Sequence, residues 1–347
     1  MDVLVVGAGV AGSLAARQLV DRGHRVTLLD KGLAPGGRLA TRRVGSATFD
    51  LGAQFLTARS ERFTSLVAGW EAAGVVRPWF RGSPDLGADP DADGHPRWRG
   101  HPTMRTLATH LIAGLDVSLG TVVTRVAVRD GGWEVEAATR RPGTPSRPDA
   151  VEEHAPRHRL RADALVLTAP VPQSLALLQA GQVPLPDDEV ARLRRLTYDP
   201  CLTLLAVPRG PVSLPKRGAV RIEDGTLAWV GDQRASGASA TPAVTVHAAA
   251  AFSRDHLDAS DEVVGRRLVR AAAGVLHAEL DPVHLHRWRY AAPTAQSGAP
   301  SHLLRLDGAP LALAGDAFVG GRVEGAARSG LDAGERLAAT ADGASGP

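Results

Sequence analysis

The first thirty residues pass from an apolar run through a glycine-rich turn into a helical pattern and back to an apolar run. The first run covers 2–6, and leucine and valine then recur at helical spacing as far as Gly23. The second run, 25–29, stops at Asp30. This order predicts strand, tight turn, helix and strand, which is a βαβ unit of the dinucleotide-binding kind.

The rest of the chain predicts a second sheet and then a return to the first. Helical spacing predicts helices over 60–74, 103–112, 172–179 and 261–277, and a last helix from Val323. Strand-like runs lie at 121–129, 133–138, 159–160, 163–167, 201–207, 219–222, 227–231 and 244–249. The final strand, 311–314, fits only beside the first βαβ unit, so one lobe is assembled from both ends of the chain.

These elements predict an α/β nucleotide-binding domain with an inserted α+β lobe built on an antiparallel sheet. We expect the first domain to comprise 1–58, 101–180 and 305–340, and the inserted lobe to comprise 59–100 and 181–304. Segments 82–94 and 140–158 are polar, bear proline and lack periodicity, so they predict loops.

The amino-acid composition argues against several classes of protein. The 347 residues are 44% hydrophobic, and no apolar run reaches the length of about 18 residues that a membrane span needs. The 40 basic and 37 acidic residues are interspersed, which argues against nucleic-acid binding. The single cysteine, Cys201, cannot form a disulfide within the chain, and no Cys/His cluster has metal-binding spacing. Without a signal-like opening, the sequence predicts a cytoplasmic, metal-free protein.

Three glycines define the first turn. Gly7 permits a tight reversal, Gly9 lets the backbone approach a pyrophosphate, and Gly12 lets the helix pack close to the strand. Asp30 lies at the end of the second strand, where a carboxylate can accept the ribose hydroxyls of an adenosine. The unit predicts a bound dinucleotide but does not separate NAD from FAD.

Five further segments identify a family. Segments 36–43, 49–55, 315–316, 320–326 and 287–291 resemble the flavin amine oxidase superfamily, and most closely the bacterial branch of the renalase family. The resemblance implies a Rossmann-like domain of the glutathione reductase and amine oxidase type, with one non-covalent FAD. It places on the cofactor Gly7, Gly9, Ala11, Gly12, Asp30, Lys31, Gly37, Arg38, Gly52, Ala53, Gln54, Val123, Gly315, Asp316, Val323 and Glu324.

Several of these positions also have a chemical rationale. The guanidinium of Arg38 can neutralise the diphosphate, and the amide of Gln54 can hydrogen-bond the edge of the isoalloxazine. The helix from Val323 can point its amino end at the flavin, and Arg322 adds positive charge there. Glu324 in that first turn is either a catalytic carboxylate or a partner of the helix dipole.

Trp288 and Tyr290 alternate with Arg287 and Arg289 on a predicted strand, so the two aromatic side chains share one face. That face either stacks a flat substrate or fills the core between the lobes. We take Gln54, Trp288, Tyr290, Arg322 and Glu324 as the candidate catalytic residues. His247 and Trp229 are candidates for lining the cavity, and His247 reads equally well as a core histidine.

The resemblance implies an oxidase for the 2- or 6-dihydro isomers of NAD(P)H, restoring NAD(P)+ and passing electrons to O2 as hydrogen peroxide. An oxidase or dehydrogenase of an amine or a secondary metabolite is the alternative, because this superfamily changes substrate through its second lobe. A lesser alternative is a redox partner that binds FAD without turnover. The expected partners are a small-molecule substrate and O2, with no nucleic acid or membrane, in a monomer or homodimer.

Overall fold

A computed structural model describes the chain except residues 83–84, 86–93, 141–155 and 343–347, so most of the two expected loops lies outside the described residues. The described chain forms two compact units. Unit 1 comprises Met1–Gly37, Ala108–Thr197 and Pro293–Pro347, and unit 2 comprises Arg38–Leu107 and Tyr198–Ala292.

These boundaries differ from the expected ones in four segments: 38–58 and 101–107 belong to unit 2, and 181–197 and 293–304 belong to unit 1. For 38–58 the reason is packing. Phe49 and Leu51, in and just after strand β4 (Ala47–Asp50), share an apolar cluster with Leu205 and Ala243.

Unit 1 is built on a six-stranded sheet with the order β17-β18-β11-β1-β2-β7. The strands from β18 to β7 pair in parallel, and β17 runs antiparallel to β18 at the edge. The expected return of strand 311–314 to the first lobe is therefore confirmed, and β18 pairs with β11 there. The strands are β1 (Asp2–Val6), β2 (Arg25–Asp30), β7 (Asp116–Leu119), β11 (Ala164–Leu167), β17 (His302–Leu306) and β18 (Ala309–Leu313).

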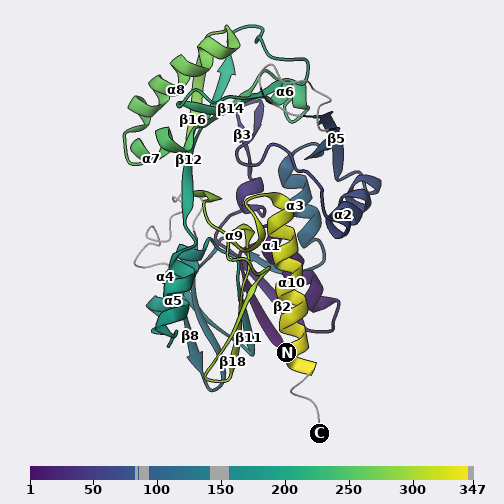
Figure 1. The fold of residues 1–347 in the computed structure, drawn as a ribbon, viewed down its shortest axis with the longest axis vertical. Helices are drawn as coiled ribbons and strands as arrows, with labels where there is room; N and C mark the ends of the chain where they lie inside the picture. The colour runs from purple at the N-terminus through teal and green to yellow at the C-terminus, as the bar shows by residue number, and fades with distance from the viewer. Residues whose placement is uncertain (83–84, 86–93, 141–155, 343–347) are drawn as a thin grey trace. The chain divides into compact units, whose positions relative to one another are not determined.

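Two helices from opposite ends of the sequence pack together on this sheet (Figure 1): α1 (Val10–Val20) and α10 (Val323–Asp342). A Cβ added at Gly330 would lie 2.1 Å from the carbonyl oxygen of Ala11, and one at Gly334 would lie 2.8 Å from that of Ala15. The two helices therefore approach backbone to backbone, which only glycine at these positions allows.

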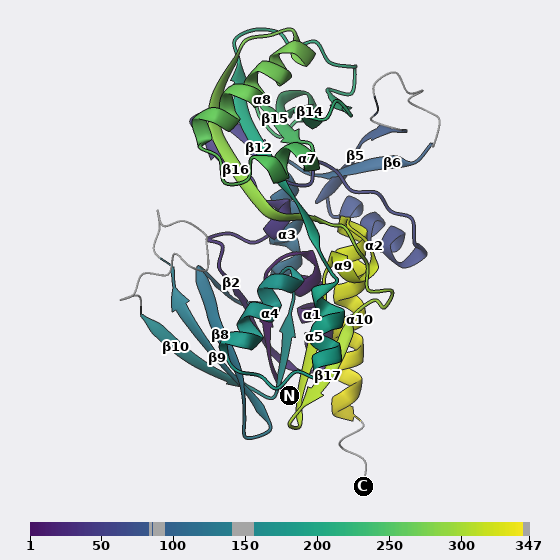
Figure 2. The same cartoon turned by 60° about the vertical axis from the view of Figure 1, so that its left-hand side comes forward.

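The remaining elements of unit 1 form a smaller layer. Strands β8 (Thr121–Arg129), β9 (Gly132–Thr139) and β10 (Arg157–Ala162) make an antiparallel sheet, with α4 (Val171–Ala180) beside β8 (Figure 2). Helix α5 (Asp187–Arg194) packs on α4, and the short α9 (Asp316–Val319) precedes α10. The indole of Trp133 is buried here and donates from Nε1 to the carbonyl oxygen of Pro310 at 2.7 Å.

Unit 2 is built on a five-stranded sheet with the order β13-β14-β15-β12-β16. Its apolar face, which includes Leu204, Val230 and Val246, packs against Val264 and Leu268. The helices on this side are α7 (Ala250–Asp255) and α8 (Asp261–Leu276). The strands are β12 (Tyr198–Pro208), β13 (Ala219–Arg221), β14 (Leu227–Asp232), β15 (Val244–Ala248) and β16 (Leu280–Pro293).

The other elements of unit 2 are two hairpins and several helices. None of the helices described anywhere in the chain is long and apolar enough to cross a bilayer. One hairpin pairs β3 (Thr41–Val44) with β4, and the other pairs β5 (Val76–Arg81) with β6 (Pro96–Gly100). Helices α2 (Glu61–Ala72) and α6 (Gln233–Ser236) lie within unit 2, and η1 (Gly37–Leu39) and α3 (Met104–Ile112) each contain a boundary between the two units.

Candidate functional site

The glycine-rich turn of unit 1 has the backbone geometry that a dinucleotide needs. Gly7 has a φ of +112°, and a Cβ there would lie 2.5 Å from Thr168 Oγ1. A Cβ at Gly12 would lie 1.9 Å from the carbonyl oxygen of Gly7, so the helix and the turn are in direct backbone contact. Nothing lies within 4 Å of a Cβ placed on Gly9, so the turn is open at that point.

Helix α1 begins immediately after this opening. No side chain caps it, and its first turn contains no acidic residue. The first amides of a helix have no partner within the helix, so they can donate to an anion. Gly37 runs beside the turn, with its Cβ position 3.8 Å from the Cα of Gly9, and Gly36 donates its amide to Ala8. This arrangement fits the diphosphate of a dinucleotide.

Asp30 is already engaged by the backbone. Its Oδ2 accepts from the amide of Ala8 and its Oδ1 from that of Gly32, each at 2.6 Å. Burial raises the pKa of Asp30, and these two hydrogen bonds oppose that rise. Burial also lowers the pKa of the neighbouring Lys31. A carboxylate has about four lone-pair sites, so two remain for ribose hydroxyls.

The carboxyl-terminal motif of unit 1 is a second place of open backbone. Nothing lies within 4 Å of a Cβ on Gly315, whose amide donates to Ser329 Oγ at 2.8 Å. Asp316 is 5% exposed and Glu324 is 9% exposed, and both have interaction partners in the structure. Arg322 is exposed and directly precedes α10. The roles predicted for this segment at the flavin stay predictions.

In unit 2 the sheet holds segment 50–54 in place. Thr245 Oγ1 donates to the carbonyl oxygen of Asp50 at 3.0 Å, and His247 Nε2 donates to that of Leu51 at 2.9 Å. Burial lowers the pKa of His247 to about 4, so the ring is neutral near pH 7. His247 is half-buried, and its Nε2 has its hydrogen bond satisfied by the backbone. Gln233 Oε1 accepts from the amide of Asp50 at 3.1 Å.

Gln54 is fixed within the same network. Its Nε2 donates to the carbonyl oxygens of Asp50 at 2.7 Å and Gly52 at 3.0 Å, and its Oε1 accepts from Gln233 Nε2 at 2.8 Å. Both N–H donors of the amide are thus used inside the segment, and one lone pair on Oε1 remains. A Cβ at Gly52 would lie 2.1 Å from the carbonyl oxygen of Arg38, so this turn also requires glycine.

A buried ion pair anchors the segment from the other side. Arg99 Nη2 lies 3.2 Å from Asp50 Oδ2, and the two side chains are 1% and 2% exposed. Asp50 Oδ1 also accepts from Thr41 Oγ1 at 2.6 Å and from the amide of Met104 at 3.1 Å. Sequence reasoning did not single out Asp50, Arg99 or Gln233, because buried polar partners from distant segments leave no local pattern.

Two predicted cofactor residues, Arg38 and Val123, have contacts within the protein. Arg38 Nη1 donates to the carbonyl oxygen of Ala291 at 3.1 Å within unit 2. Val123 is buried in β8, and the register with β9 shifts between Val123 and Arg125. The predicted contacts of Arg38 with the diphosphate and of Val123 with adenine stay predictions.

The alternation predicted around Trp288 is present on β16. Arg287 and Arg289 reach Asp261 and Asp258, whereas Trp288 packs against the apolar cluster of Phe49 and Leu51. The rings of Trp288 and His286 meet edge to face at 4.2 Å, and those of Tyr290 and Tyr198 at 5.8 Å. Trp288 is thus part of the unit 2 core on at least one side, and stacking on a substrate stays a prediction.

Unit 2 contains a cluster of aromatic rings that the sequence predicted only in part. Phe55 lies 5.8 Å from Phe80 and 5.6 Å from Trp229, and Trp79 lies 5.1 Å from Phe80 and 6.3 Å from Trp229, between ring centroids. Trp229 was a candidate, and Phe55 ends a family motif. The adjacent pair Trp79-Phe80 was the available signal, but it lies on a strand that the pattern did not predict.

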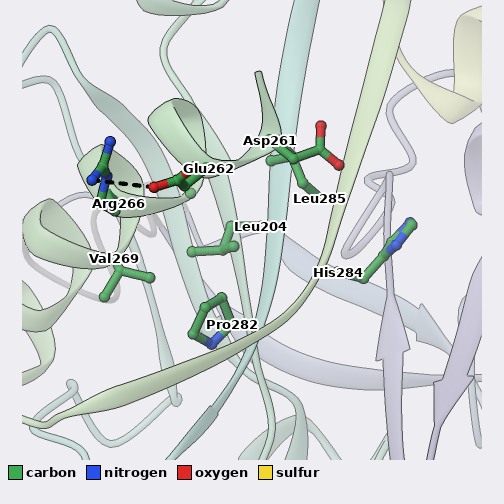
Figure 3. Close-up of a pocket in the computed structure, with 9 residues that line it drawn as sticks. Leu204, Asp261, Glu262, Arg266, Val269, Pro282, His284 and Leu285 are labelled. Carbon is green, nitrogen blue, oxygen red and sulfur yellow. Dashed lines mark ion pairs between the residues drawn. The ribbon is translucent and has the colours of Figure 1, made fainter. Parts of the chain in front are cut away.

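Figure 3 shows a pocket of about 350 Å³ beside the amino-terminal turn of α8. An ion pair of 3.3 Å between Glu262 and Arg266 lies at its edge, and both side chains are largely exposed. None of the predicted site residues lines this pocket, which consists of Leu204, Asp261, Glu262, Gly265, Arg266, Val269, Pro282, His284 and Leu285.

Two curated proteins match short stretches of the chain. Protein FLOWERING LOCUS D of Arabidopsis thaliana is 37% identical over 104 residues, which are 26% of this chain and 13% of that protein. A 4,4'-diapophytoene desaturase of Staphylococcus haemolyticus is 44% identical over 52 residues, which are 15% of this chain and 10% of that protein. The chain therefore matches only a small part of each relative's length.

Solved structures match over nearly the whole chain. A triple mutant of putrescine oxidase has a TM-score of 0.68 at 15% identity, covering 98% of this chain and 99% of that one. A CLA-producing fatty acid isomerase from P. acnes has a TM-score of 0.66 at 12% identity, covering 96% and 98%. At such identities the likeness shows the fold alone, and the two proteins differ in activity, one being an oxidase and the other an isomerase.

Two family descriptions match the sequence. The NAD(P)-binding Rossmann-like domain matches residues 5–70, and the flavin containing amine oxidoreductase matches residues 87–338. The second match spans well over half of the 347 residues. The chain therefore belongs to the flavin-containing amine oxidoreductase family.

Proposed function

We propose that the protein is a renalase-like oxidase, which converts the 2- or 6-dihydro isomers of NAD(P)H to NAD(P)+ and passes the electrons to O2 as hydrogen peroxide. FAD, when bound, supplies the hydride and electron-transfer chemistry. The protein's own task is to bind a flat dihydropyridine ring and its phosphates in one orientation. The proposal places the protein in the cytoplasm, as a monomer or homodimer.

The observation that carries this proposal is the positive charge beside the aromatic cluster. Trp79 and Phe80 lie on β5 between Arg77 and Arg81, and the guanidinium of Arg217 lies 6.0 Å from the centre of the Phe80 ring. Arg77 donates to the carbonyl oxygen of Ser236 at 3.0 Å and Arg81 to that of Gly94 at 2.9 Å. Neutral carbonyl partners leave the arginine charges in place. Such a surface attracts phosphates and repels an ammonium group.

Oxidation of an amine or a secondary metabolite is the second candidate, and the family match together with the likeness to putrescine oxidase favours it. Both candidates use the same FAD lobe and differ in what unit 2 binds. Gln54, Trp288, Tyr290, Arg322 and Glu324 remain the proposed catalytic residues under either one.

The test is anaerobic mixing of the FAD-loaded protein with each candidate reductant, followed by absorbance of the oxidised flavin. We expect rapid bleaching with a 2- or 6-dihydro isomer, slow bleaching with ordinary NADH, and peroxide formed in step with reoxidation in air. The ordinary 4-dihydro isomer presents its hydride at another ring position, so one fixed pose discriminates against it. If NADH or putrescine reduces the flavin as fast as the isomers do, the amine or metabolite oxidase takes the place of this proposal.

A further inference from the structure

The aromatic cluster contains an indole N–H that has no acceptor. Trp229 is 6% exposed, and its Nε1 has no hydrogen-bond partner among the described residues. Buried indole N–H groups nearly always find a partner, as that of Trp133 does in Pro310 at 2.7 Å. A buried donor left without an acceptor is costly. Trp288 Nε1 is also buried without a partner among the described residues. Trp229 Nε1 lies near the side-chain oxygen of Gln54, and this pairing points to an acceptor supplied by a ligand.

The backbone of Gly231 lies against this indole. A Cβ added at Gly231 would lie 2.8 Å from Trp229 Nε1, so no larger residue fits without displacing the indole. The same position lies 3.7 Å from Gln54 Oε1. A hydrogen-bond donor and an acceptor thus lie close to each other beside the Gly231 backbone.

The acceptor is held in a fixed orientation. Gln54 Nε2 is committed to two backbone carbonyls, and its Oε1 receives one hydrogen bond from Gln233. Oε1 therefore keeps one lone pair for a ligand, and the amide cannot flip without losing these three bonds. Phe55, Trp79 and Phe80 are half-buried, so they still offer ring surface next to this donor and acceptor.

We infer that these groups recognise a flat ring that bears a primary carboxamide. Trp229 Nε1 donates to the carboxamide oxygen, the carboxamide –NH2 donates to Gln54 Oε1, and the ring lies against the aromatic cluster. Within the proposed function, on which this inference rests, the group is the carboxamide of the dihydronicotinamide. Trp229 is then a specificity-determining residue and takes no part in hydride transfer.

The experiment measures binding to the oxidised, FAD-loaded protein by calorimetry, so it needs no turnover. The probes are NAD+, which carries the carboxamide, and 3-acetylpyridine adenine dinucleotide, in which a methyl ketone keeps the oxygen but lacks the –NH2. We expect the wild type to bind NAD+ about three- to tenfold more tightly than the ketone, the equivalent of one hydrogen bond. Equal affinity for the two dinucleotides, or no binding of NAD+, would overturn the inference without any substitution.

Trp229→Phe removes the N–H and keeps a ring. It should weaken the binding of both dinucleotides by about three- to tenfold, because each offers the same oxygen as an acceptor. The matched control is Trp133→Phe, which removes a buried indole N–H in unit 1 and should leave both affinities unchanged. Trp229→Phe breaks no hydrogen bond within the protein, so it should lower the melting temperature less than Trp133→Phe, which loses the bond to Pro310 as well as buried ring surface. An unchanged affinity in Trp229→Phe, or a loss of FAD in its place, would refute the assignment of the N–H to the substrate.

The two proposals fail separately. If the dihydro isomers do not reduce the flavin but NAD+ binding depends on Trp229, the proposed reaction is wrong and the carboxamide site stands. If the isomers reduce the flavin and Trp229→Phe binds NAD+ normally, the reaction stands and the carboxamide site is wrong.

Discussion

Replacing Arg99 by Met should destabilise unit 2 by about 3–5 kcal/mol, because it leaves the Asp50 carboxylate buried without its cation. In the wild type the two charged groups are 3.2 Å apart and almost fully buried. Arg99 also donates to the carbonyl oxygens of Ser236 and Pro102, which the variant leaves with one donor fewer. For a unit of this length, the loss corresponds to a fall in melting temperature of roughly 6–20 °C.

The pH dependence of this loss tests its cause. Burial raises the pKa of Asp50, and in the variant no guanidinium opposes that rise. A carboxyl group whose folded pKa exceeds its unfolded value of about 3.9 contributes stability below that value and loses it as the pH rises through the folded pKa. The penalty of Arg99→Met should therefore shrink as the pH is lowered from about 8 toward about 5. Urea unfolding at several pH values measures it.

The control is Arg266→Met, which breaks an ion pair with Glu262 that is 71% and 76% exposed. Exposed pairs contribute at most about 1 kcal/mol, so this variant should unfold close to the wild type at every pH. Equal losses in the two variants, or a loss in Arg99→Met that does not change with pH, would refute the buried-pair account.

Three further predictions concern the cofactor lobe and the core. Gly12→Ala should lower both FAD retention and melting temperature, because its Cβ would lie 1.9 Å from a carbonyl oxygen. Gly9→Ala has open space at its Cβ, so it should keep the fold and lose FAD affinity. Flavin absorbance and melting curves distinguish the two outcomes. Asp30→Ala and Arg38→Ala should each raise the dissociation constant of FAD about tenfold or more, and apo-protein titrations in which neither changes it would show that the adenosine and diphosphate contacts are misplaced. The pKa of His247 is lowered from 6.5 to about 4, so between these pH values the unfolded chain binds a proton that the folded chain does not, and stability falls as the pH drops. His247→Gln should make the melting temperature depend less on pH in this range. An unchanged pH profile would contradict the lowered pKa of His247.

Much of unit 1 could be predicted because its signals are local. The glycine turn, Asp30 and the apolar runs of β1, β2 and β11 lie in short continuous stretches, and the structure has them within a residue or two of the expected positions. Parallel strands buried on both faces are apolar throughout, which makes them easy to recognise. Helix α5, with charged residues on most of its surface, offers no such run and was not predicted.

The site in unit 2 was less predictable because its partners are far apart in the sequence. Gln54 and Gln233 are 179 residues apart, and Asp50 and Arg99 are 49 apart. No spacing rule links such residues, and an amide side chain is equally common on protein surfaces. The family resemblance drew attention to Gln54, whereas its partner became visible only when the sheet brought β14 and α6 beside segment 50–54.

Because α10 packs on α1, the first βαβ unit is synthesised long before the helix that covers it. On a ribosome adding about 5–20 residues per second, α10 emerges about 15–60 s after the first βαβ unit. During that interval the surface of α1 around Ala11 and Ala15, which α10 later covers, has no partner from its own lobe. The nascent nucleotide-binding unit therefore presents an apolar helix face to solvent and to chaperones, and this face is covered only when α10 arrives.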